Sequence, residues 1–431
     1  MNVSLRYGRG WVEAELPEKW HVEVLAPAGH EPVSNVQAAV VEALDRPIGL
    51  PPLSDRARGR DWALVVVSDI TRPVPNALLM PALLERLESA GVPASRVVVL
   101  IATGLHRPAT KAEIQELLGE ETVRAGVQVV SHRAREVAEH QSLGKTTTGV
   151  PVTLDRRYLE APLRIVVGLV EPHFMAGFSG GPKSLCPGLA SAETIMGFHS
   201  PALLSHERVA PGVTEGNLFL EEIRRVAERA GEPELCVNFV LDAERRIVGV
   251  FGGRMGEVHK AAIARARETL TARLSEPADL VLTSGGGYPL DLTFYQGVKG
   301  IVAGVGAARL GGCVIVFQQN AEGAGSAEFA SLLASCDDPA VWPIDCGRNR
   351  AQVIDEWEMV ELAKAARRAR IINVCPDAPA SLRELVPIPT VNTLEEALDL
   401  LVKTSALDCR SPKVAVMPDG PYTLVQCDRK T

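Results

Sequence analysis

The sequence predicts an α/β protein of two domains, each a mostly parallel sheet flanked by helices, with the functional site in the cleft between them. Its 431 residues are too many for one ordinary hydrophobic core. With 46% hydrophobic and 23% charged residues, the composition is that of a globular protein. Short apolar runs alternate with helical segments, and this alternation is typical of parallel sheets that are covered on both faces.

The first half of the chain shows this alternation most clearly. The unbroken apolar run Trp62–Ser68 (WALVVVS) indicates a strand buried on both faces. The helix expected next, Asn76–Ala90, contains Pro81, which should kink it or delay its start. Thr110 and Glu113 have the spacing of a capping box and should begin the helix AEIQELLG. Further strands are predicted at Arg96–Ala102, Val127–Ser131 and Arg164–Val170.

A second unit is predicted to begin near Ala278. The strand Asp279–Thr283 leads into the glycine-rich loop SGGGYPLD and then into a helix over Leu292–Arg309, which Gly311 and Gly312 should end. The elements expected after it are the strand Cys313–Phe317, a helix around Trp357–Arg368, the strand ARIINV, a helix near Leu394–Val402 and the strand KVAVMP.

These elements suggest where the domains divide. We expect one domain over residues 1–270 and a second over residues 278–402. The segment TARLSEPA, residues 271–278, should be the hinge between them. The last strand, KVAVMP, is expected to carry residues 403–431 back to the first domain.

Charge and composition exclude several classes of protein. A net charge of −8 argues against a nucleic-acid partner held by phosphate neutralisation. No stretch reaches the roughly 20 apolar residues that span a bilayer, and MNVSLRYGRGWVEAELPEKW has no apolar signal-peptide core, so we expect a cytoplasmic protein without a membrane partner. The cysteines form no CxxC pair, which argues against a zinc ribbon or a disulfide framework and favours reduced, mostly buried thiols: Cys186, Cys236, Cys313, Cys336, Cys346, Cys375, Cys409 and Cys427.

Polar side chains gather where three of the predicted strands end. The segments SDITRPVP, TGLHRP and EPHFMAGFSGGPKSLCPG follow the strands that end at Ser68, Ala102 and Val170. In an open parallel sheet, ligands bind beyond the carboxyl ends of the strands. A single histidine in a loop is usually a surface residue, but five such residues at successive strand ends favour one functional crevice: Asp69, Arg72, His106, His173 and Lys183.

The segment GFSGGPKS nearly spells a phosphate-binding P-loop. Gly177 and Lys183 fit the pattern G-x-x-x-x-G-K-[ST], but Pro182 stands where the second glycine belongs. Proline has no N–H to offer a phosphate, so an ATP-dependent enzyme is disfavoured. GKT at residues 144–146 also fails, because Glu139 replaces the first glycine. The glycines around Lys183 still allow backbone to approach a bulky flat ligand closely.

Two further elements can reach the same crevice. His199, in GFHSP, follows Lys183 closely in the chain, and histidine is a ligand for borderline metals such as nickel. No HExxH motif or tight His/Cys cluster accompanies it, which suggests a cofactor that supplies most of the metal's ligands. Tyr295 and Lys299 are spaced i,i+4 and share one helix face. On spacing alone, substrate contact and an interdomain packing role are equally good interpretations of this pair.

Together, SDITRPVP, TGLHRP, EPHFMAGFSGGPKSLCPG, GFHSP and FYQGVKG resemble the nickel-dependent lactate racemase family over essentially the whole chain. The resemblance implies a racemase or epimerase that inverts C2 of a 2-hydroxyacid. It also implies a nickel pincer nucleotide, pyridinium-3-thioamide-5-thiocarboxylic acid mononucleotide, in a cofactor-binding N-terminal domain and an active site between the domains. A host that supplies this cofactor would need cofactor-synthesis machinery, and a homodimer is a further expectation.

The resemblance also implies roles for individual residues. Lys183 would carry the cofactor covalently and His199 would be the protein ligand to nickel. His106 and His173 match paired acid/base histidines. The other expected contacts are Asp69, Ser179 and Gly180 to the cofactor, and Arg72, Lys299, Tyr295, Gln296 and Trp357 to the substrate.

The implied chemistry suits these residue types. The C2 proton of a 2-hydroxyacid is too weakly acidic for histidine to remove at neutral pH. One histidine would instead take the hydroxyl proton while hydride leaves C2 for the pyridinium ring. Two alternatives remain open: an epimerase of larger, sugar-type hydroxyacids on the same scaffold, and a non-catalytic carrier of the nickel cofactor. A carrier would need Lys183 and His199 but neither His106 nor His173.

Overall fold

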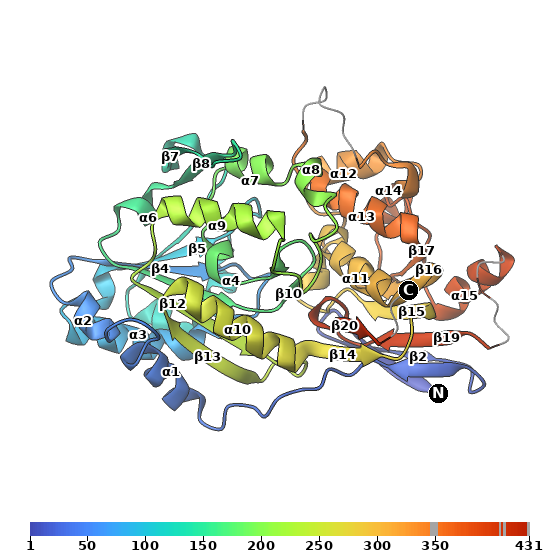
Figure 1. The fold of residues 1–431 in the computed structure, drawn as a ribbon, viewed down its shortest axis with the longest axis horizontal. Helices are drawn as coiled ribbons and strands as arrows, with labels where there is room; N and C mark the ends of the chain where they lie inside the picture. Colours follow the sequence, from blue (N-terminus) through green and yellow to red (C-terminus); the bar gives the residue numbers. More distant parts are fainter. Residues whose placement is uncertain (345–351, 405–406, 408–410, 429–431) are drawn as a thin grey trace.

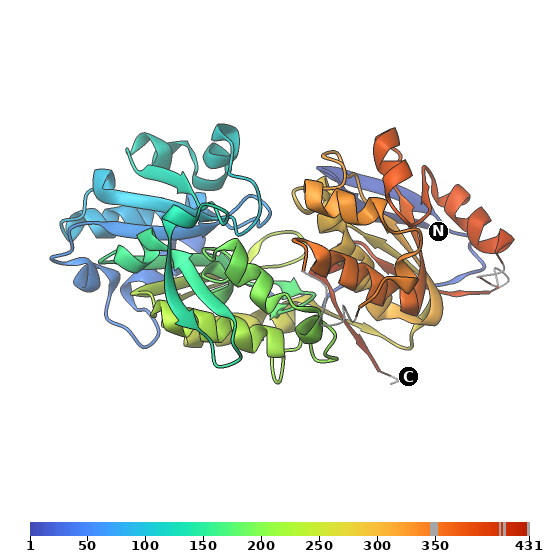
Figure 2. The same cartoon turned by 90° about the horizontal axis from the view of Figure 1, so that it is seen from above.

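The computed structural model describes residues 1–344, 352–404, 407 and 411–428. Its chain forms two lobes that lie side by side, each built on a six-stranded sheet (Figures 1 and 2). Among the described residues, no helix is long and apolar enough to cross a membrane. Among the described cysteines, Cys427 is partly exposed and the others are buried, while Cys346 and Cys409 lie outside the described residues.

The sheet of the first lobe has the strand order β13-β12-β9-β4-β5-β6. All neighbours pair in parallel except β12 and β13, which are antiparallel. Its strands are β4 (Ala63–Ser68), β5 (Val97–Ala102), β6 (Gln128–Ser131), β9 (Arg164–Leu169), β12 (Leu235–Leu241) and β13 (Ile247–Gly253). The strands predicted near residues 62–68, 96–102, 127–131 and 164–170 are therefore confirmed, and β12 and β13 complete the sheet.

Helices cover both faces of this sheet, as the alternation predicts. One buried cluster joins α1 (Val36–Asp45), α2 (Leu53–Ala57), α3 (Asn76–Ser89) and α4 (Lys111–Leu118) to one face. A second cluster joins α7 (Ala192–Phe198), α9 (Leu218–Ala230) and α10 (Met255–Leu270) to the other. The capping box of Thr110 and Glu113 begins α4 as predicted, whereas Pro81 lies inside α3 without delaying its start.

Shorter elements complete the first lobe. They are α5 (Glu120–Arg124), α6 (Arg156–Glu160), α8 (Pro201–Leu204), the hairpin of β7 (His140–Lys145) and β8 (Pro151–Asp155), and the small pair of β10 (Pro172–His173) and β11 (Gly177–Phe178). The β10/β11 pair matters for function because it folds the segment after β9 back toward the second lobe.

The second lobe has a parallel sheet of order β18-β17-β16-β15-β19-β3. Its strands are β3 (His21–Val24), β15 (Ala278–Ser284), β16 (Ala308–Phe317), β17 (Ala369–Val374), β18 (Thr390–Val391) and β19 (Lys413–Met417). One face packs against α11 (Phe294–Ala307), α12 (Ala327–Ala334), α13 (Glu356–Arg368) and α14 (Ala380–Leu385). The other packs against α15 (Leu394–Lys403) and the hairpin of β1 (Asn2–Tyr7) and β2 (Gly10–Glu15).

The two ends of the chain lie elsewhere than the sequence analysis placed them. β19 pairs with β15 and β3 in the second sheet and does not return to the first lobe. Residues 1–25 also build the second lobe, although they were assigned to the first domain. The cause is packing: Val414 and Val416 of β19 fill one face of the second sheet, while Ala415 and Met417 fill the other.

The boundary between α11 and β16 also differs from the prediction. α11 ends at Ala307, and β16 begins at once with Ala308, so Gly311 and Gly312 lie within the strand and do not end the helix. Pairing with β15 shifts between Ala278 and Leu280, and Gly311 has a positive φ of 74° at this irregularity. The glycines therefore accommodate a bulge. The predicted helices at 357–368 and 394–402 are confirmed.

The predicted hinge contains a strand that pairs with a strand near the C-terminal end of the chain. β14 (Thr271–Leu274) runs parallel to β20 (Leu424–Cys427), just before the chain enters β15 (Figure 1). This ribbon lies beside the cleft, so the residues that lead into β20 also reach the space between the lobes.

Candidate active site

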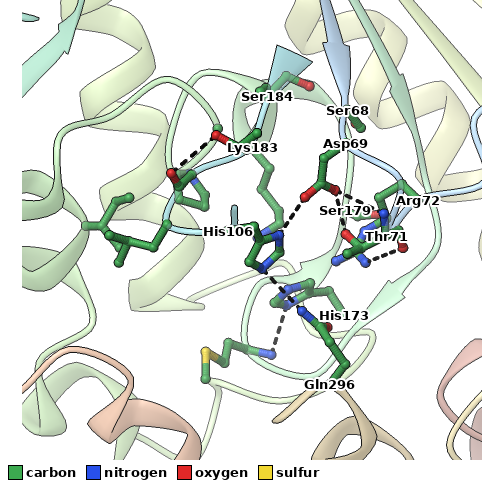
Figure 3. Close-up of a pocket in the computed structure, with 18 of the residues that line it drawn as sticks. Ser68, Asp69, Thr71, Arg72, His106, His173, Ser179, Lys183, Ser184 and Gln296 are labelled. Carbon is green, nitrogen blue, oxygen red and sulfur yellow. Dashed lines mark hydrogen bonds and ion pairs between the residues drawn. The ribbon is translucent and has the colours of Figure 1, made fainter. Parts of the chain in front are cut away.

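A cavity of about 150 Å³ lies between the two lobes, at the carboxyl ends of β4, β5 and β9. The first lobe contributes the loops after these strands, and the second lobe contributes one face each of α11 and α13. Figure 3 shows how these side chains converge. All twelve residues predicted for the site line this cavity: Asp69, Arg72, His106, His173, Ser179, Gly180, Lys183, His199, Tyr295, Gln296, Lys299 and Trp357.

His106 is held from both sides by hydrogen bonds that fix its tautomer. The amide of Gln296 approaches Nε2 of His106 at 3.2 Å, and Lys299 donates to Oε1 of the same Gln296. The amide NH₂ of Gln296 therefore faces His106 and can only donate, so Nε2 of His106 accepts. The proton of the neutral ring then lies on Nδ1 and is donated to Oδ2 of Asp69, at 2.6 Å.

Asp69 is buried, and its carboxylate accepts hydrogen bonds both from His106 and from Thr71 in its own loop. Its other oxygen accepts from the hydroxyl of Thr71 at 2.6 Å. Although burial opposes ionisation, the adjacent His106 and the hydrogen bond from Thr71 hold the pKa of Asp69 below its usual value. The sequence analysis expected this residue to contact the cofactor; the structure places it behind His106, as the group that orients the ring.

His173 is oriented the opposite way. Its Nδ1 accepts from the backbone N–H groups of Met175 and Ala176, both at 3.2 Å. The neutral ring therefore carries its proton on Nε2, the atom left for the cavity. Burial, followed by the charges of Lys183 and Lys299, lowers the pKa of His173 well below the usual histidine value, so the ring is neutral at pH 7.

Arg72 is partly buried and is anchored by a carboxylate. Its Nε lies 3.1 Å from Oε1 of Glu171, and Nη1 donates to the carbonyl of Thr71 at 3.1 Å. Burial raises the pKa of Glu171, and the positive charge of Arg72 opposes this rise. One edge of the guanidinium is therefore committed to the protein, while Nη2 remains for a ligand anion.

Lys299 lies opposite Arg72 on α11. Burial and the neighbouring Arg72 lower its pKa to about 7, while Glu358 and Glu171 oppose this shift. Arg72 and Lys299 thus form a paired positive wall on which a small anion can bind. Tyr295 and Trp357 flank it, and the indole Nε1 donates to the Tyr295 hydroxyl at 2.8 Å. The structure therefore places Tyr295 and Lys299 at the site.

Lys183 stands in a short 3₁₀ turn, Gly181–Ser184, where the backbone is closely packed. A Cβ at Gly180 would lie 2.6 Å from Oδ1 of Asn238, and one at Gly181 would lie 2.5 Å from the His259 ring. Burial, together with Arg72 and Lys299, lowers the pKa of Lys183 to about 7. A large share of this amine is therefore neutral, and hence nucleophilic, at physiological pH.

His199 presents a single free nitrogen to the cavity. Nδ1 donates to the carbonyl of Ile195 at 2.8 Å, which leaves the Nε2 lone pair available. Burial lowers the pKa of His199 to about 3, so the ring stays neutral. The ring also packs against Trp357, with centroids 4.5 Å apart. A neutral imidazole fixed through its other nitrogen is the form that binds metals.

Within the part of the chain that the structure describes, no three His, Cys, Asp or Glu side chains lie close enough together to hold a metal ion. The described residues therefore do not form a complete metal site around His199.

Ser179 and Gly180 contribute backbone to the cavity wall. The hydroxyl of Ser179 donates to the carbonyl of Leu169 at 2.7 Å and accepts from the Glu171 N–H at 3.0 Å. This hydroxyl therefore holds the loop after β9 in shape. Gly180 has a positive φ of 75° and approaches Asn238 too closely for any side chain.

The sequence analysis missed two buried carboxylates near the cations. Glu171 holds Arg72, and Glu358 lines the cavity from α13 beside Lys299. The signal for Glu171 was a charged residue directly after the apolar strand RIVVGLV. Glu358 offered no comparable signal, because DEWEMVELAKAARR is rich in charge and only the packing of α13 shows which residues are buried.

Comparison with protein families gives two matches that together span most of the chain. The model of the lactate racemase N-terminal domain matches residues 7–211. The model of the lactate racemase C-terminal domain matches residues 274–425.

Individual relatives agree with these matches. The chain is 32% identical to a protein named lactate racemase from Thermoanaerobacterium thermosaccharolyticum, and this match covers 99% of both chains. It is also 32% identical to a protein named lactate racemase from Lactiplantibacillus plantarum, over 98% of this chain and 99% of the relative. The apoprotein structure of the first superimposes with a TM-score of 0.86 at 31% identity, covering 99% of this chain and 100% of that one. A Thermotoga maritima protein at 17% identity shares the fold, with a TM-score of 0.70 over 92% of this chain and 100% of its own.

Proposed function

The chain belongs to the lactate racemase family and is an isomerase, and we propose that it inverts C2 of a lactate-like 2-hydroxyacid with a nickel pincer nucleotide on Lys183. One observation carries this proposal. One cavity between the lobes is lined by a nucleophilic lysine, a histidine with a free Nε2, two oppositely oriented histidines and a pair of cations. Two full-length relatives are named lactate racemase, which supports lactate as the reference substrate.

The residues present fit the proposed cofactor. The Lys183 amine, with a pKa of about 7, is suited to form a thioamide bond, and the lone pair on Nε2 of His199 would bind nickel. His199 has no companion ligands among the described residues, as expected if the cofactor brings them. When bound, the nickel pincer nucleotide would supply the hydride acceptor and the remaining metal ligands. The host would then need the machinery that synthesises the nucleotide.

His106 would take the hydroxyl proton of the substrate at Nε2. Because Asp69 accepts the proton on Nδ1, the Nε2 lone pair is directed toward the cavity and the positive charge that develops on the ring is stabilised. In the structure the amide of Gln296 donates a hydrogen bond to this lone pair at 3.2 Å, and the substrate hydroxyl would replace that bond.

His173 would serve the opposite face of the substrate. Its Nε2–H can donate to the oxygen on C2, so the two histidines begin from complementary states, one accepting and one donating. The proton returned to the oxygen is the one that His106 took from the hydroxyl, and His173 stabilises that oxygen through its Nε2–H without losing the proton.

Arg72 and Lys299 would hold the substrate carboxylate while C2 inverts. Glu171 fixes the guanidinium, and Gln296 fixes the ammonium group of Lys299. Burial lowers the pKa of Lys299, as expected in surroundings of lower dielectric than water, where the attraction between these cations and a carboxylate is stronger. Tyr295 and Trp357 would close the side of the cavity next to His199.

The test is to produce the chain together with the cofactor-synthesis machinery and to follow the optical purity of D- and L-lactate and of longer 2-hydroxyacids. We expect racemisation, and an increase in intact mass that Lys183→Ala removes. Protein made without the machinery should lack both. An unmodified chain with full activity would overturn the proposed cofactor. A loaded chain that converts no 2-hydroxyacid would overturn the proposed reaction and leave the carrier interpretation.

A further inference from the structure

The side-chain amine of Lys183 makes no hydrogen bond or ion pair with any residue that the structure describes. The hydrogen bonds of this residue are made by its backbone: the N–H donates to the Gly180 carbonyl at 3.2 Å, and the carbonyl accepts from the Gly188 N–H at 3.2 Å. The side chain lines the cavity between the lobes (Figure 3). The backbone turn is therefore fixed, and the amine is left for a molecule that enters the cavity.

Two further cations line the same cavity, and each has a polar partner of a kind that Lys183 lacks among the described residues. Arg72 is paired with Glu171, and Lys299 donates to Gln296. Burial first, and then the charges of Arg72 and Lys299, lower the pKa of Lys183 to about 7. The cavity therefore combines a guanidinium that stays charged with an amine that is often neutral at pH 7.

These two features together match a ligand that has a carboxylate beside a carbonyl. A neutral lysine attacks a carbonyl carbon, and a guanidinium binds a carboxylate. In a 2-oxoacid the two groups are joined directly, so one small molecule can meet both Lys183 and Arg72 in one cavity. The cavity, of about 150 Å³, has about ten times the roughly 15 Å³ that one water molecule requires, so a short 2-oxoacid fits.

The groups that move protons in such an addition line the same cavity. Nε2 of His173 carries a proton and can donate to the carbonyl oxygen, because its Nδ1 accepts from two backbone N–H groups. Nε2 of His106 has a lone pair, because its Nδ1 donates to Asp69. His106 can therefore take a proton from the nitrogen after the attack and return it to the departing oxygen.

We propose that Lys183 of the chain without cofactor binds 2-oxoacids as a reversible imine, with the carboxylate of the acid held by Arg72 and Lys299. Nζ forms a double bond to C2, the bonds between C2 and its oxygen break, and the two amine protons leave with that oxygen as water. No atom is oxidised or reduced in this step. The imine occupies the amine that the proposed function assigns to the cofactor, so a 2-oxoacid blocks loading. Its formation needs neither nickel nor the nucleotide, and it can therefore be tested apart from that function.

The test uses the full chain made without the cofactor-synthesis machinery. The chain is incubated at neutral pH with 2-oxopropanoate and sodium cyanoborohydride, which reduces an imine to a stable amine. Intact mass then counts the adducts, and peptide mapping locates them. We expect one adduct per chain, on Lys183. Exposed lysines have pKa values near 10.4 and stay protonated at neutral pH, so they should react more slowly.

A matched ligand shows whether the site recognises the carboxylate. Methyl 2-oxopropanoate keeps the ketone but lacks the carboxylate charge. The acid should label Lys183 about 100-fold more than the ester does, once this ratio is divided by the same ratio at exposed Lys145. Arg72→Gln and Lys299→Gln should each lower this quotient about tenfold, because each removes one charged partner of the carboxylate. A change in the pKa of Lys183 would affect both ligands equally and cancels in the quotient.

Variants assign the adduct to one amine. Lys183→Met should remove it, and Lys145→Met, at an exposed lysine, is the matched control that keeps it. Lactate has no carbonyl, so it should form no adduct and should slow the labelling of Lys183 by binding the same two cations. A chain that carries the reduced adduct should gain no nucleotide when the cofactor-synthesis machinery is supplied. Circular dichroism of each variant checks that its fold is retained.

The possible results separate the imine from the proposed function. The imine is overturned if no adduct forms, if the adduct survives in Lys183→Met or maps to Lys299, or if the corrected labelling by acid and ester is equal. Each of these results leaves the proposed function in place, because the nucleotide can bind where no imine forms. Conversely, an adduct on Lys183 of a chain that never gains the nucleotide supports the imine and overturns the proposed cofactor.

Discussion

Nδ1 of His106 lies 2.6 Å from Oδ2 of Asp69, which joins the ends of β4 and β5 through one hydrogen bond. The contact decides what His106 can do, because a ring that donates from Nδ1 must accept at Nε2. A second donor, the amide of Gln296, approaches that Nε2 from the other lobe. The proton-accepting atom therefore lies at the interface between the lobes.

Asp69→Asn should lower kcat roughly 100- to 10,000-fold, because an amide can orient the wrong tautomer and cannot stabilise the charged ring. KM should change less than kcat, because the Asp69 side chain hydrogen-bonds His106 and Thr71 and acts on Arg72 and Lys299 only through its charge. Steady-state kinetics in both directions provides the measurement. Thr71→Val, which removes only the hydroxyl bond to Asp69, is the matched control and should cost far less. Equal losses in the two variants would indicate that Asp69 merely holds the loop.

His106→Ala should depress the D-to-L and L-to-D rates together, by the roughly 100- to 10,000-fold typical of a lost general acid/base. His173→Ala should also depress both rates, by the roughly 100- to 1,000-fold typical of a lost hydrogen-bond donor to a developing oxyanion. The equilibrium constant fixes the ratio of the two kcat/KM values, so neither direction can lose kcat/KM alone. Polarimetry from each pure enantiomer, in nickel-loaded protein, measures both rates. Retained turnover in His173→Ala would remove that histidine from the reaction.

His199→Ala should lower the nickel content of purified loaded protein while circular dichroism stays unchanged. The proposal gives this side chain one bond to the metal, so the loss should be partial if the cofactor remains on Lys183. Metal analysis per chain, with intact mass recorded on the same sample, separates loss of nickel from loss of the nucleotide. His21→Ala, at an exposed site on β3, is the control. Unchanged nickel and turnover in His199→Ala would contradict the assignment.

Lys183→Met should stabilise the unloaded chain at pH 7 by roughly 1–3 kcal/mol, because it removes an amine whose burial disfavours its charged form. The folded-state pKa of about 7 lies below the unfolded value near 10.4, so between these values only the unfolded chain holds the proton. Wild-type stability at this group therefore rises with pH from about 7 toward 10.4, and Lys183→Met should lack that rise.

Urea unfolding across this pH range checks the Lys183 prediction. Lys145→Met, at an exposed lysine, is the matched control and should leave the pH dependence as it is in the wild type. An identical pH slope in wild type and Lys183→Met would show that the lysine is hydrated in the folded chain. The amine would then be mostly charged at neutral pH and poorly suited to form the covalent bond.

The sequence was sufficient to predict that residues after β4, β5 and β9 meet at the site, but not that Glu358 also lines it. Parallel strands bring their carboxyl ends to one edge, so the residues after β4, β5 and β9 had to converge there. Pattern alone could not predict which side chains pair, because the bond between Asp69 and His106 spans 37 positions and depends on loop conformation. The same limit applies to Glu171, whose partner Arg72 lies in the loop after a different strand, β4.

The ends of the chain were harder to assign for a different reason. β3 and β19 are short strands, and their residue patterns do not indicate which of the two sheets they join. Only the register, with Val414 opposite both Leu280 and Val22, shows that they extend the second sheet.

The central claim is that hydrogen leaves C2 as hydride and returns to the opposite face of the same carbon. The most direct test uses lactate deuterated at C2, converted in ordinary water by the loaded enzyme, with mass spectrometry of the inverted product. We predict that the inverted product retains the deuterium, because the hydrogen never becomes a proton that water can exchange. Rapid loss of the label to solvent would contradict this claim and favour direct proton abstraction by His106 and His173.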